Sequence, residues 1–125
     1  MLVDTDVLIW HLRGNPKATQ QLDRLQPLTI SAITYMELLQ GIRNRSELLA
    51  LQKSLTLRHT EQLPVTPAIT TRATGFMEAL ALSHGLQLAD ALIAATALEH
   101  GFAVLTANTK HFAPIQGLRV EPFEP

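Results

Sequence analysis

The stretch MLVDTDVLIW (residues 1–10) places two carboxylates between two apolar runs. The first run predicts a short strand at residues 2–3, and the second begins a helix over about residues 7–13. Asp6 is expected to cap this helix, because aspartate is among the residues preferred at the N-cap. Asp4 then lies at the carboxyl end of the strand. The opening of the chain therefore predicts a strand, a tight turn and a helix.

Helices and strands alternate along the rest of the chain. The expected helices cover residues 16–26, 33–43, 46–57, 67–83 and 88–100, and the expected strands cover residues 28–30, 62–65, 102–106 and 118–120. Ser31 is the expected N-cap of the helix over 33–43, and Gly85 and Gly101 follow the last two helices as stop signals. Residues 106–117 are expected to form a polar loop. This alternation implies right-handed crossovers and a mostly parallel sheet covered on both faces, so we expect an α/β fold.

The composition favours a single compact domain in the cytoplasm. The chain has 125 residues, of which 46% are hydrophobic, and this is enough to bury a core. No apolar run approaches the roughly 20 residues of a membrane span. The absence of cysteine excludes disulfides and thiolate zinc sites. The net charge of -1 gives no overall signature of nucleic-acid binding, so a nucleic-acid substrate would need a local patch.

Four polar residues stand where a site is expected in a parallel sheet. Asp4 and Asn108 each follow an apolar strand, and ligands of such sheets bind beyond the carboxyl ends of the strands. Glu37 and Asp90 lie near helix starts among apolar residues, where an unpaired charge is costly to bury. The alternating topology would bring these three acids and one amide to the same edge of the sheet.

Each of these residues also has an ordinary structural interpretation. Asp90 could cap a helix, Glu37 could pair with Arg43, and Asn108 could be a turn residue. Taken together, however, converging carboxylates without an intervening cation repel one another, and a hard divalent ion such as Mg²⁺ or Mn²⁺ relieves that repulsion. Such an ion can activate a water molecule and stabilise the leaving oxygen of a phosphodiester, which is nuclease chemistry.

The chain resembles the PIN-domain ribonucleases, and most closely the VapC-type toxins of toxin–antitoxin pairs. The resemblance rests on four stretches in order, which are LVDTDVLIWHL, ISAITYMELLQGI, LQLADALIAATALEHGFAVLTANTKHF and PIQGLRV. It covers nearly the whole chain and implies one PIN domain over residues 1–125. The implied fold is a three-layer sandwich whose central, mostly parallel, twisted sheet of four to five strands is flanked by helices.

The resemblance also assigns roles to individual residues. The three family acids match Asp4, Glu37 and Asp90, the fourth position is Asn108, the orienting hydroxyls are Thr5 and Thr106, and Asp6 takes a further family position. Asp4 and Asp90 are the expected ligands of Mg²⁺, with Mn²⁺ as a possible substitute. Two departures stand out. His111 replaces an acid common before the final Phe, and Asn108 lowers the charge of the site, so we expect one tightly bound ion.

By resemblance, the function is metal-dependent hydrolysis of RNA phosphodiester bonds by a growth-inhibiting toxin. The implied partners are the RNA substrate, a cognate antitoxin and a second copy of the chain, with the two acidic sites of the homodimer facing a shared groove. A non-catalytic PIN-fold RNA- or protein-binding module and a solitary RNA-processing nuclease are the alternatives.

Hydrolases of other classes fit the sequence less well. The string DTDVL also resembles the nucleophile motif of haloacid dehalogenase-type phosphatases, but their late acidic pair is missing. A receiver domain needs a mid-chain aspartate, and none lies between Asp23 and Asp90. The five histidines are scattered without the spacing of a zinc hydrolase, so structural or surface roles are expected for them.

Overall fold

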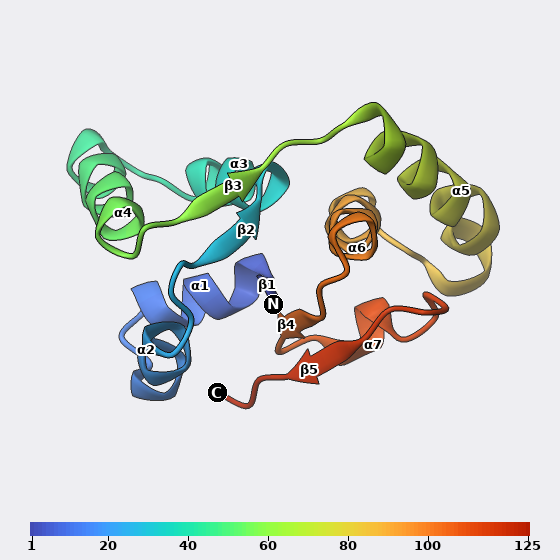
Figure 1. Cartoon of the computed structure of the whole chain (residues 1–125). Coiled ribbons are helices and arrows are strands. Elements are labelled where there is room, and N and C mark those ends of the chain that lie inside the picture. Colours follow the sequence, from blue (N-terminus) through green and yellow to red (C-terminus); the bar gives the residue numbers. More distant parts are fainter.

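A computed structural model describes all residues from 1 to 125 (Figure 1). Its elements are, in order, β1 (Leu2–Val3), α1 (Thr5–Leu12), α2 (Pro16–Asp23), β2 (Thr29–Ser31), α3 (Ala32–Gln40), α4 (Arg45–Leu57), β3 (Glu61–Leu63), α5 (Pro67–His84), α6 (Leu88–His100), β4 (Val104–Thr106), α7 (Thr109–Phe112) and β5 (Val120–Pro122). No helix combines the length and the apolar composition that a membrane span requires.

All strand pairs are parallel, as the alternation of helices and strands predicts. β1, β4 and β5 form one hydrogen-bonded group in the order β1-β4-β5, and β2 pairs with β3 in a second group. β2 lies beside β1, so the two groups follow one another across the molecule. From β1 the chain first proceeds to β2 and β3 on one side and later to β4 and β5 on the other. β1 and β4 therefore flank the point at which the strand order reverses, which is where ligands bind in open α/β sheets.

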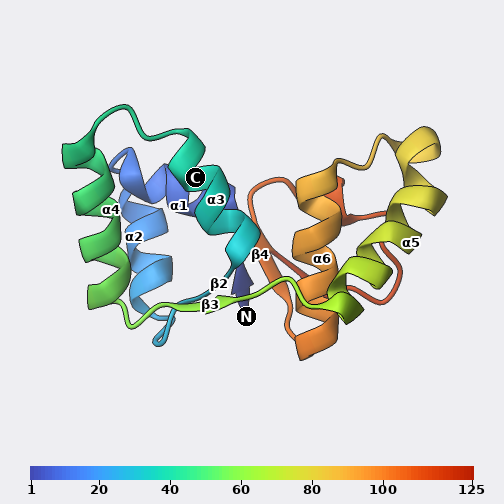
Figure 2. The same cartoon turned by 90° about the horizontal axis from the view of Figure 1, so that it is seen from above.

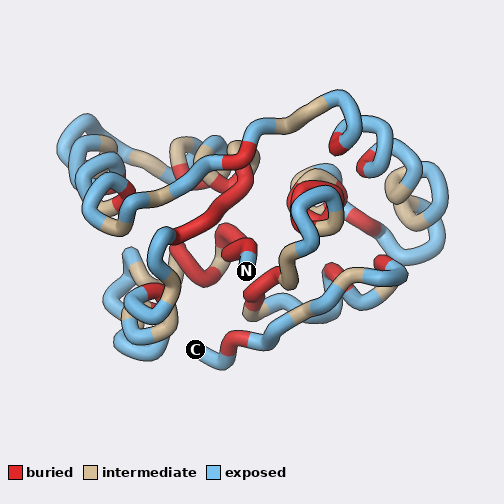
Figure 3. The backbone as a smooth tube through the Cα atoms, viewed as in Figure 1, coloured by how far each residue is buried: buried red, intermediate tan, exposed pale blue.

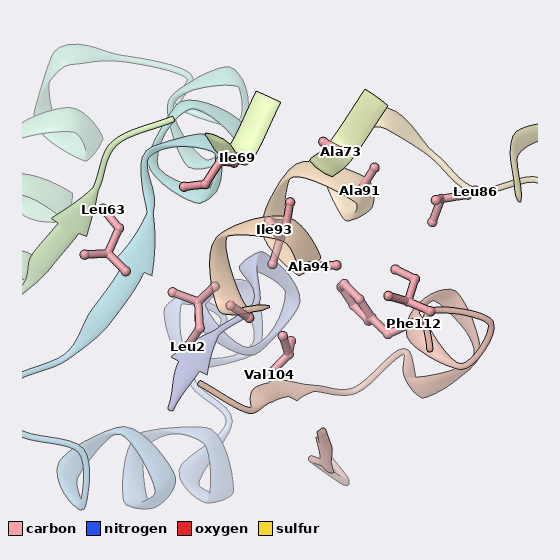
Figure 4. Close-up of a cluster of buried hydrophobic side chains, with 13 residues drawn as sticks. Leu2, Leu63, Ile69, Ala73, Leu86, Ala91, Ile93, Ala94, Val104 and Phe112 are labelled. Carbon is pink, nitrogen blue, oxygen red and sulfur yellow. The ribbon is translucent and has the colours of Figure 1, made fainter. Parts of the chain in front are cut away.

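The strands separate two hydrophobic cores. Successive strand residues point to opposite faces, so Leu2 and Val104 enter one core while Val3 and Leu105 enter the other. The first core packs mainly under α5 and α6 and includes the fully buried Phe112 (Figure 4). The second core packs under α1, α2 and α4. Figure 2 shows these two groups of helices on either side of the strands, and Figure 3 shows that the buried backbone concentrates between them. The α/β layered architecture is thus confirmed.

Local signals explain several element boundaries. The Ser31 hydroxyl accepts a hydrogen bond from the Ile33 amide at 3.0 Å, which confirms the predicted cap of α3. Gly85 and Gly101 end α5 and α6 with φ values of 66° and 70°, a left-handed conformation that glycine adopts without steric cost.

Two local predictions are wrong. The first helix begins at Thr5, and its N-cap is Asp4 rather than Asp6, which lies in the first turn. The reason is that β1 ends at Val3 and the chain turns at once, so the earlier of the two aspartates takes the cap. The predicted polar loop over residues 106–117 contains a short helix, α7, because Phe112 is drawn into the core and folds the chain around it.

Candidate active site

The site begins where β1 and β4 end side by side. The Asp4 amide donates a 2.9 Å hydrogen bond to the Leu105 carbonyl, which continues the parallel ladder by one residue. The two Asp4 carboxylate oxygens have different partners. Oδ1 accepts from the Thr5 amide at 2.8 Å, and Oδ2 accepts from the Thr106 hydroxyl at 2.8 Å. Asp4 is buried, and these hydrogen bonds fix the orientation of its carboxylate.

Asp6 ties the first turn of α1 to the segment that follows β4. Its Oδ2 atom accepts hydrogen bonds from the Ala107 amide at 3.0 Å and from the Asn108 side-chain amide at 2.8 Å. The Asn108 backbone amide donates to the Thr106 hydroxyl at 2.9 Å. The other Asp6 oxygen, Oδ1, is buried and has no hydrogen-bond partner. Asp6 therefore positions Asn108 and leaves one carboxylate oxygen uncommitted.

Glu37 joins the site from α3. The Thr5 hydroxyl donates to Glu37 Oε1 at 2.6 Å, and the Thr5 oxygen also lies 3.1 Å from the Thr34 hydroxyl in a second hydrogen bond. Thr34 is fully buried and stands three residues before Glu37, on the same face of the helix. Thr34 was not predicted from the sequence, although its spacing of three residues from Glu37 was a usable signal.

Asp90 enters from the first turn of α6 and pairs with His111. His111 Nδ1 lies 3.3 Å from Asp90 Oδ2, and the imidazole is half exposed at the rim of the site. The N-cap of α6 is Gln87, so Asp90 is not the cap residue. His111 thus occupies the side of Asp90 that faces α7.

These side chains line one cleft with a volume of about 530 Å³, hereafter the acidic cleft. Its lining consists of Asp4, Thr5, Asp6, Ile9, Glu37, Gln40, Gln87, Leu88, Ala89, Asp90, Asn108 and His111. It contains four carboxylates and neither Lys nor Arg. All the sequence-predicted site residues line it except Thr106, which reaches it through hydrogen bonds to Asp4 and Asn108. Gln40 and Gln87 were not predicted from the sequence.

Burial and neighbouring carboxylates raise the pKa of two acids of the cleft. Burial, and next to it the charge of Asp6, raises the pKa of Asp4 to about 7, although the hydrogen bond from Thr106 opposes the shift. Burial is also the main reason that the pKa of Asp90 is raised, with the charges of Glu37 and Asp6 adding to it and His111 opposing it. Both shifts show that the ionised carboxylates lack a stabilising cation, and the lining of the cleft contains no Lys or Arg to supply one.

The donor set fits a hard divalent cation. The uncommitted Oδ1 of Asp6 shows that the protein alone does not satisfy all the carboxylate oxygens. Each hydrogen-bonded oxygen of Asp4 also keeps a further lone pair for a ligand contact. No three acidic or histidine side chains are arranged to hold an ion by protein atoms alone. Mg²⁺ suits such a site, because it usually keeps several waters and uses one or two carboxylates.

The structure also bears on the alternative interpretations of Glu37 and Asn108. Arg43 is bound by Glu47, with a shortest distance of 2.7 Å, so it is not the partner of Glu37. Asn108 is the N-cap residue of α7 but makes no side-chain capping hydrogen bond, and its side-chain amide donates to Asp6 instead. Glu37 and Asn108 both line the acidic cleft.

Comparison with known proteins identifies the family. The PIN domain family model matches residues 1–117. The chain is similar to Ribonuclease VapC10 of Mycobacterium tuberculosis, with 37% identity over 95% of this chain and 90% of the relative. It is also similar to a solved toxin–antitoxin complex from Klebsiella pneumoniae, with a TM-score of 0.82, 31% identity and coverage of 99% of this chain and 98% of that one. A DNA-bound VapBC from Salmonella typhimurium matches with a TM-score of 0.80, 26% identity and 97% and 96% coverage. The chain therefore belongs to the PIN domain family, in its VapC branch.

Proposed function

We propose that this protein is a metal-dependent endoribonuclease that hydrolyses RNA phosphodiester bonds, and that it is the toxin of a toxin–antitoxin pair. The observation that carries the proposal is the acidic cleft, in which Asp4, Asp6, Glu37 and Asp90 meet without a Lys or Arg among them. The names of relatives such as Ribonuclease VapC10 support the reaction. Residues 1–125 act as one domain in this proposal.

The side chains of the cleft have distinct roles in this reaction. Asp4 and Asp90 hold the metal ion, and the hydrogen bond from Thr106 keeps the Asp4 carboxylate in place. Glu37, oriented by the Thr5 hydroxyl, is the free carboxylate that can take a proton from the attacking water. Asn108, held by Asp6, presents a neutral amide towards the substrate.

VapC-type PIN nucleases generally depend on a divalent metal ion, and here that ion is Mg²⁺, with Mn²⁺ as a substitute. When bound, the ion supplies activation of water and stabilisation of the leaving oxygen. Asn108 in place of a fourth acid reduces the negative charge available to a second ion, which favours one firmly held metal.

The relatives support a proposal for the biological setting. The Klebsiella pneumoniae structure is a toxin–antitoxin complex and the Salmonella typhimurium structure is a VapBC bound to DNA. By analogy, this protein works in the cytoplasm as a homodimer, inhibits growth when it is free, and is blocked by a cognate antitoxin that covers the acidic cleft.

Cleavage of RNA by the purified protein tests the proposal. A labelled single-stranded RNA pool should be cut with Mg²⁺ or Mn²⁺, and EDTA should abolish cleavage. In cells, expression should arrest growth, and the small protein encoded beside the gene should co-purify with it and restore growth. RNA binding without cleavage would indicate a non-catalytic module instead. Cleavage without growth arrest or a bound neighbour would indicate a solitary RNA-processing enzyme.

A further inference from the structure

A second cavity lies next to the acidic cleft. It has a volume of about 580 Å³ and is enclosed by residues of α1, α3 and α4 and of the turn between α3 and α4. Ile9 and Glu37 line both spaces, so the second cavity opens directly from the catalytic side of the molecule. These three helices gather on the same side of the strands in Figures 1 and 2. We call this space the α1–α3–α4 cavity.

The walls of the α1–α3–α4 cavity differ from those of the acidic cleft. About half of its lining residues are apolar, and among them Leu12 is 51% exposed although it is a large hydrophobic side chain. The cavity also carries two guanidinium groups. Arg43 is neutralised by a bidentate contact with Glu47, whereas Arg13 is exposed and makes no ion pair. Arg13 is therefore the one cationic side chain of the cavity that is free of an ion pair.

A polymeric substrate imposes a geometric requirement on this surface. When a scissile phosphate lies among the carboxylates of the acidic cleft, the adjoining nucleotides must leave the cleft through its open sides. On the Ile9 and Glu37 side, the space outside the cleft is the α1–α3–α4 cavity. RNA phosphates there need a compensating cation, and a nucleobase needs an apolar surface.

We infer that the α1–α3–α4 cavity is a subsite for single-stranded RNA flanking the cut, in which Arg13 binds a phosphate and Leu12 contacts the adjacent base. The inference rests on the proposed ribonuclease function and adds to it the residues that position the substrate. The carboxylates of the acidic cleft repel the phosphates of RNA. A subsite at Arg13 offsets this repulsion, because it binds a phosphate at a cationic side chain outside the cleft. A polypeptide segment in the same cavity would have no use for the unpaired charge of Arg13 unless it were acidic.

Two matched arginine variants test the subsite. Arg13→Gln removes the proposed phosphate contact, and Arg24→Gln removes an exposed arginine that makes no ion pair and lines neither space. Initial rates with a random single-stranded 20-nucleotide RNA pool give KM and kcat at several salt concentrations. Loss of a charge-assisted contact should raise the KM of Arg13→Gln about tenfold and leave kcat within about twofold. The slope of log affinity against log salt should fall by about 0.7. Arg24→Gln should match wild type in all three quantities.

A third variant tests the apolar wall. Leu12→Gln should change the base preference at a nucleotide flanking the cut, as read from sequenced RNA ends, without changing the requirement for metal. The inference is overturned if Arg13→Gln and Arg24→Gln share the same KM and salt slope while wild type cleaves RNA. It is equally overturned if Arg13→Gln weakens only the binding of the antitoxin, which would assign the cavity to the protein partner. A wild-type protein that does not cleave RNA would remove the proposed function, and the subsite with it.

Discussion

Asp4 and Thr106 are separated by 102 residues, yet the Thr106 hydroxyl donates a 2.8 Å hydrogen bond to Asp4 Oδ2. This contact joins the carboxyl ends of β1 and β4, the two strands that flank the reversal of strand order. It also opposes the upward shift of the Asp4 pKa, because a hydrogen bond to a carboxylate favours its charged form. Thr106 therefore keeps the most buried acid of the cleft available as a ligand.

The electrostatic role of the Thr106 hydroxyl can be measured through the pKa of Asp4. Thr106→Val preserves the shape of the side chain but removes the hydroxyl, so the pKa of Asp4 should rise further above its present value of about 7. A carboxyl carbon NMR titration measures this pKa directly. Thr96→Val is the control, because Thr96 is equally buried and its hydroxyl bonds only to the Leu92 carbonyl within α6. Equal Asp4 titrations in the two variants would show that the Thr106 contact has no electrostatic role.

The metal-free protein should lose stability as the pH rises from about 4 to 7. Burial raises the pKa of Asp4 to about 7 in the folded state, whereas an unfolded aspartate titrates near about 3.9. The folded state thus binds a proton that the unfolded chain has released, and the associated stability is fully present at low pH and lost as the pH rises through about 7. The raised pKa of Asp90 acts in the same direction.

Thermal melts of wild type and Asp4→Asn across this pH range check the effect. The partly buried His11, whose pKa is lowered, contributes the opposite slope, but it is present in both proteins and cancels in their difference. Asparagine is also a good N-cap, so α1 keeps its start. The melting temperature of wild type should decline relative to that of Asp4→Asn as the pH rises, and parallel curves would rule out the raised pKa.

Repulsion within the acidic cleft predicts that loss of one carboxylate stabilises the metal-free fold. Asp90→Asn should melt a few degrees above wild type, for about 1 kcal/mol in a domain of this size. Added Mg²⁺ should raise the melting temperature of wild type, because it binds only the folded state, and should affect the variant less. The measurement is a four-way melt at fixed ionic strength in buffer free of Ca²⁺. A variant that melts lower than wild type and responds equally to Mg²⁺ would make Asp90 a structural residue.

A substitution at His111 can add a carboxylate to the cleft instead of removing one. The His111 imidazole lies 3.3 Å from Asp90 and opposes the upward shift that burial gives the pKa of that carboxyl. His111→Glu replaces it with a carboxylate, so the metal-free protein should melt lower while Mg²⁺ raises its melting temperature more than that of wild type. His111→Gln keeps a neutral hydrogen-bond donor and should lie between the two. If His111→Glu shows no larger response to Mg²⁺ than His111→Gln, the side chain does not face the metal ligands.

The sequence was a good guide to regular elements and to residues next to strands. Ser31, Gly85 and Gly101 act where local propensity places them, and Asp4 and Asn108 lie beyond strands as the alternation of elements implies. Capping preferences did not identify the N-cap in the DTD stretch, because either aspartate suits that position. The N-cap is Asp4 because β1 ends at Val3. Capping and periodicity rules also failed where a contact depends on tertiary packing.

Two parts of the site illustrate the second failure. The hydrogen bond between Thr5 and Thr34 spans 29 residues and depends on how α1 packs against α3. The helix α7 forms around a buried Phe112, and a run of polar residues gives no local sign of that burial. In both cases the information lies in the packing of distant elements, which periodicity and capping rules do not contain.

The central claim is that Asp4 and Asp90 hold the catalytic metal, and single-turnover cleavage of RNA by two charge-neutralised variants tests it most directly. Asp4→Asn and Asp90→Asn should each lose much more than tenfold in rate with Mg²⁺, a loss above about 1.4 kcal/mol of transition-state stabilisation. Asp23→Asn is the matched control, because the Asp23 carboxylate is exposed, pairs with Arg58 and does not line the acidic cleft. This variant should cleave at the wild-type rate. Rates within about tenfold of wild type for both Asp4→Asn and Asp90→Asn would contradict the account.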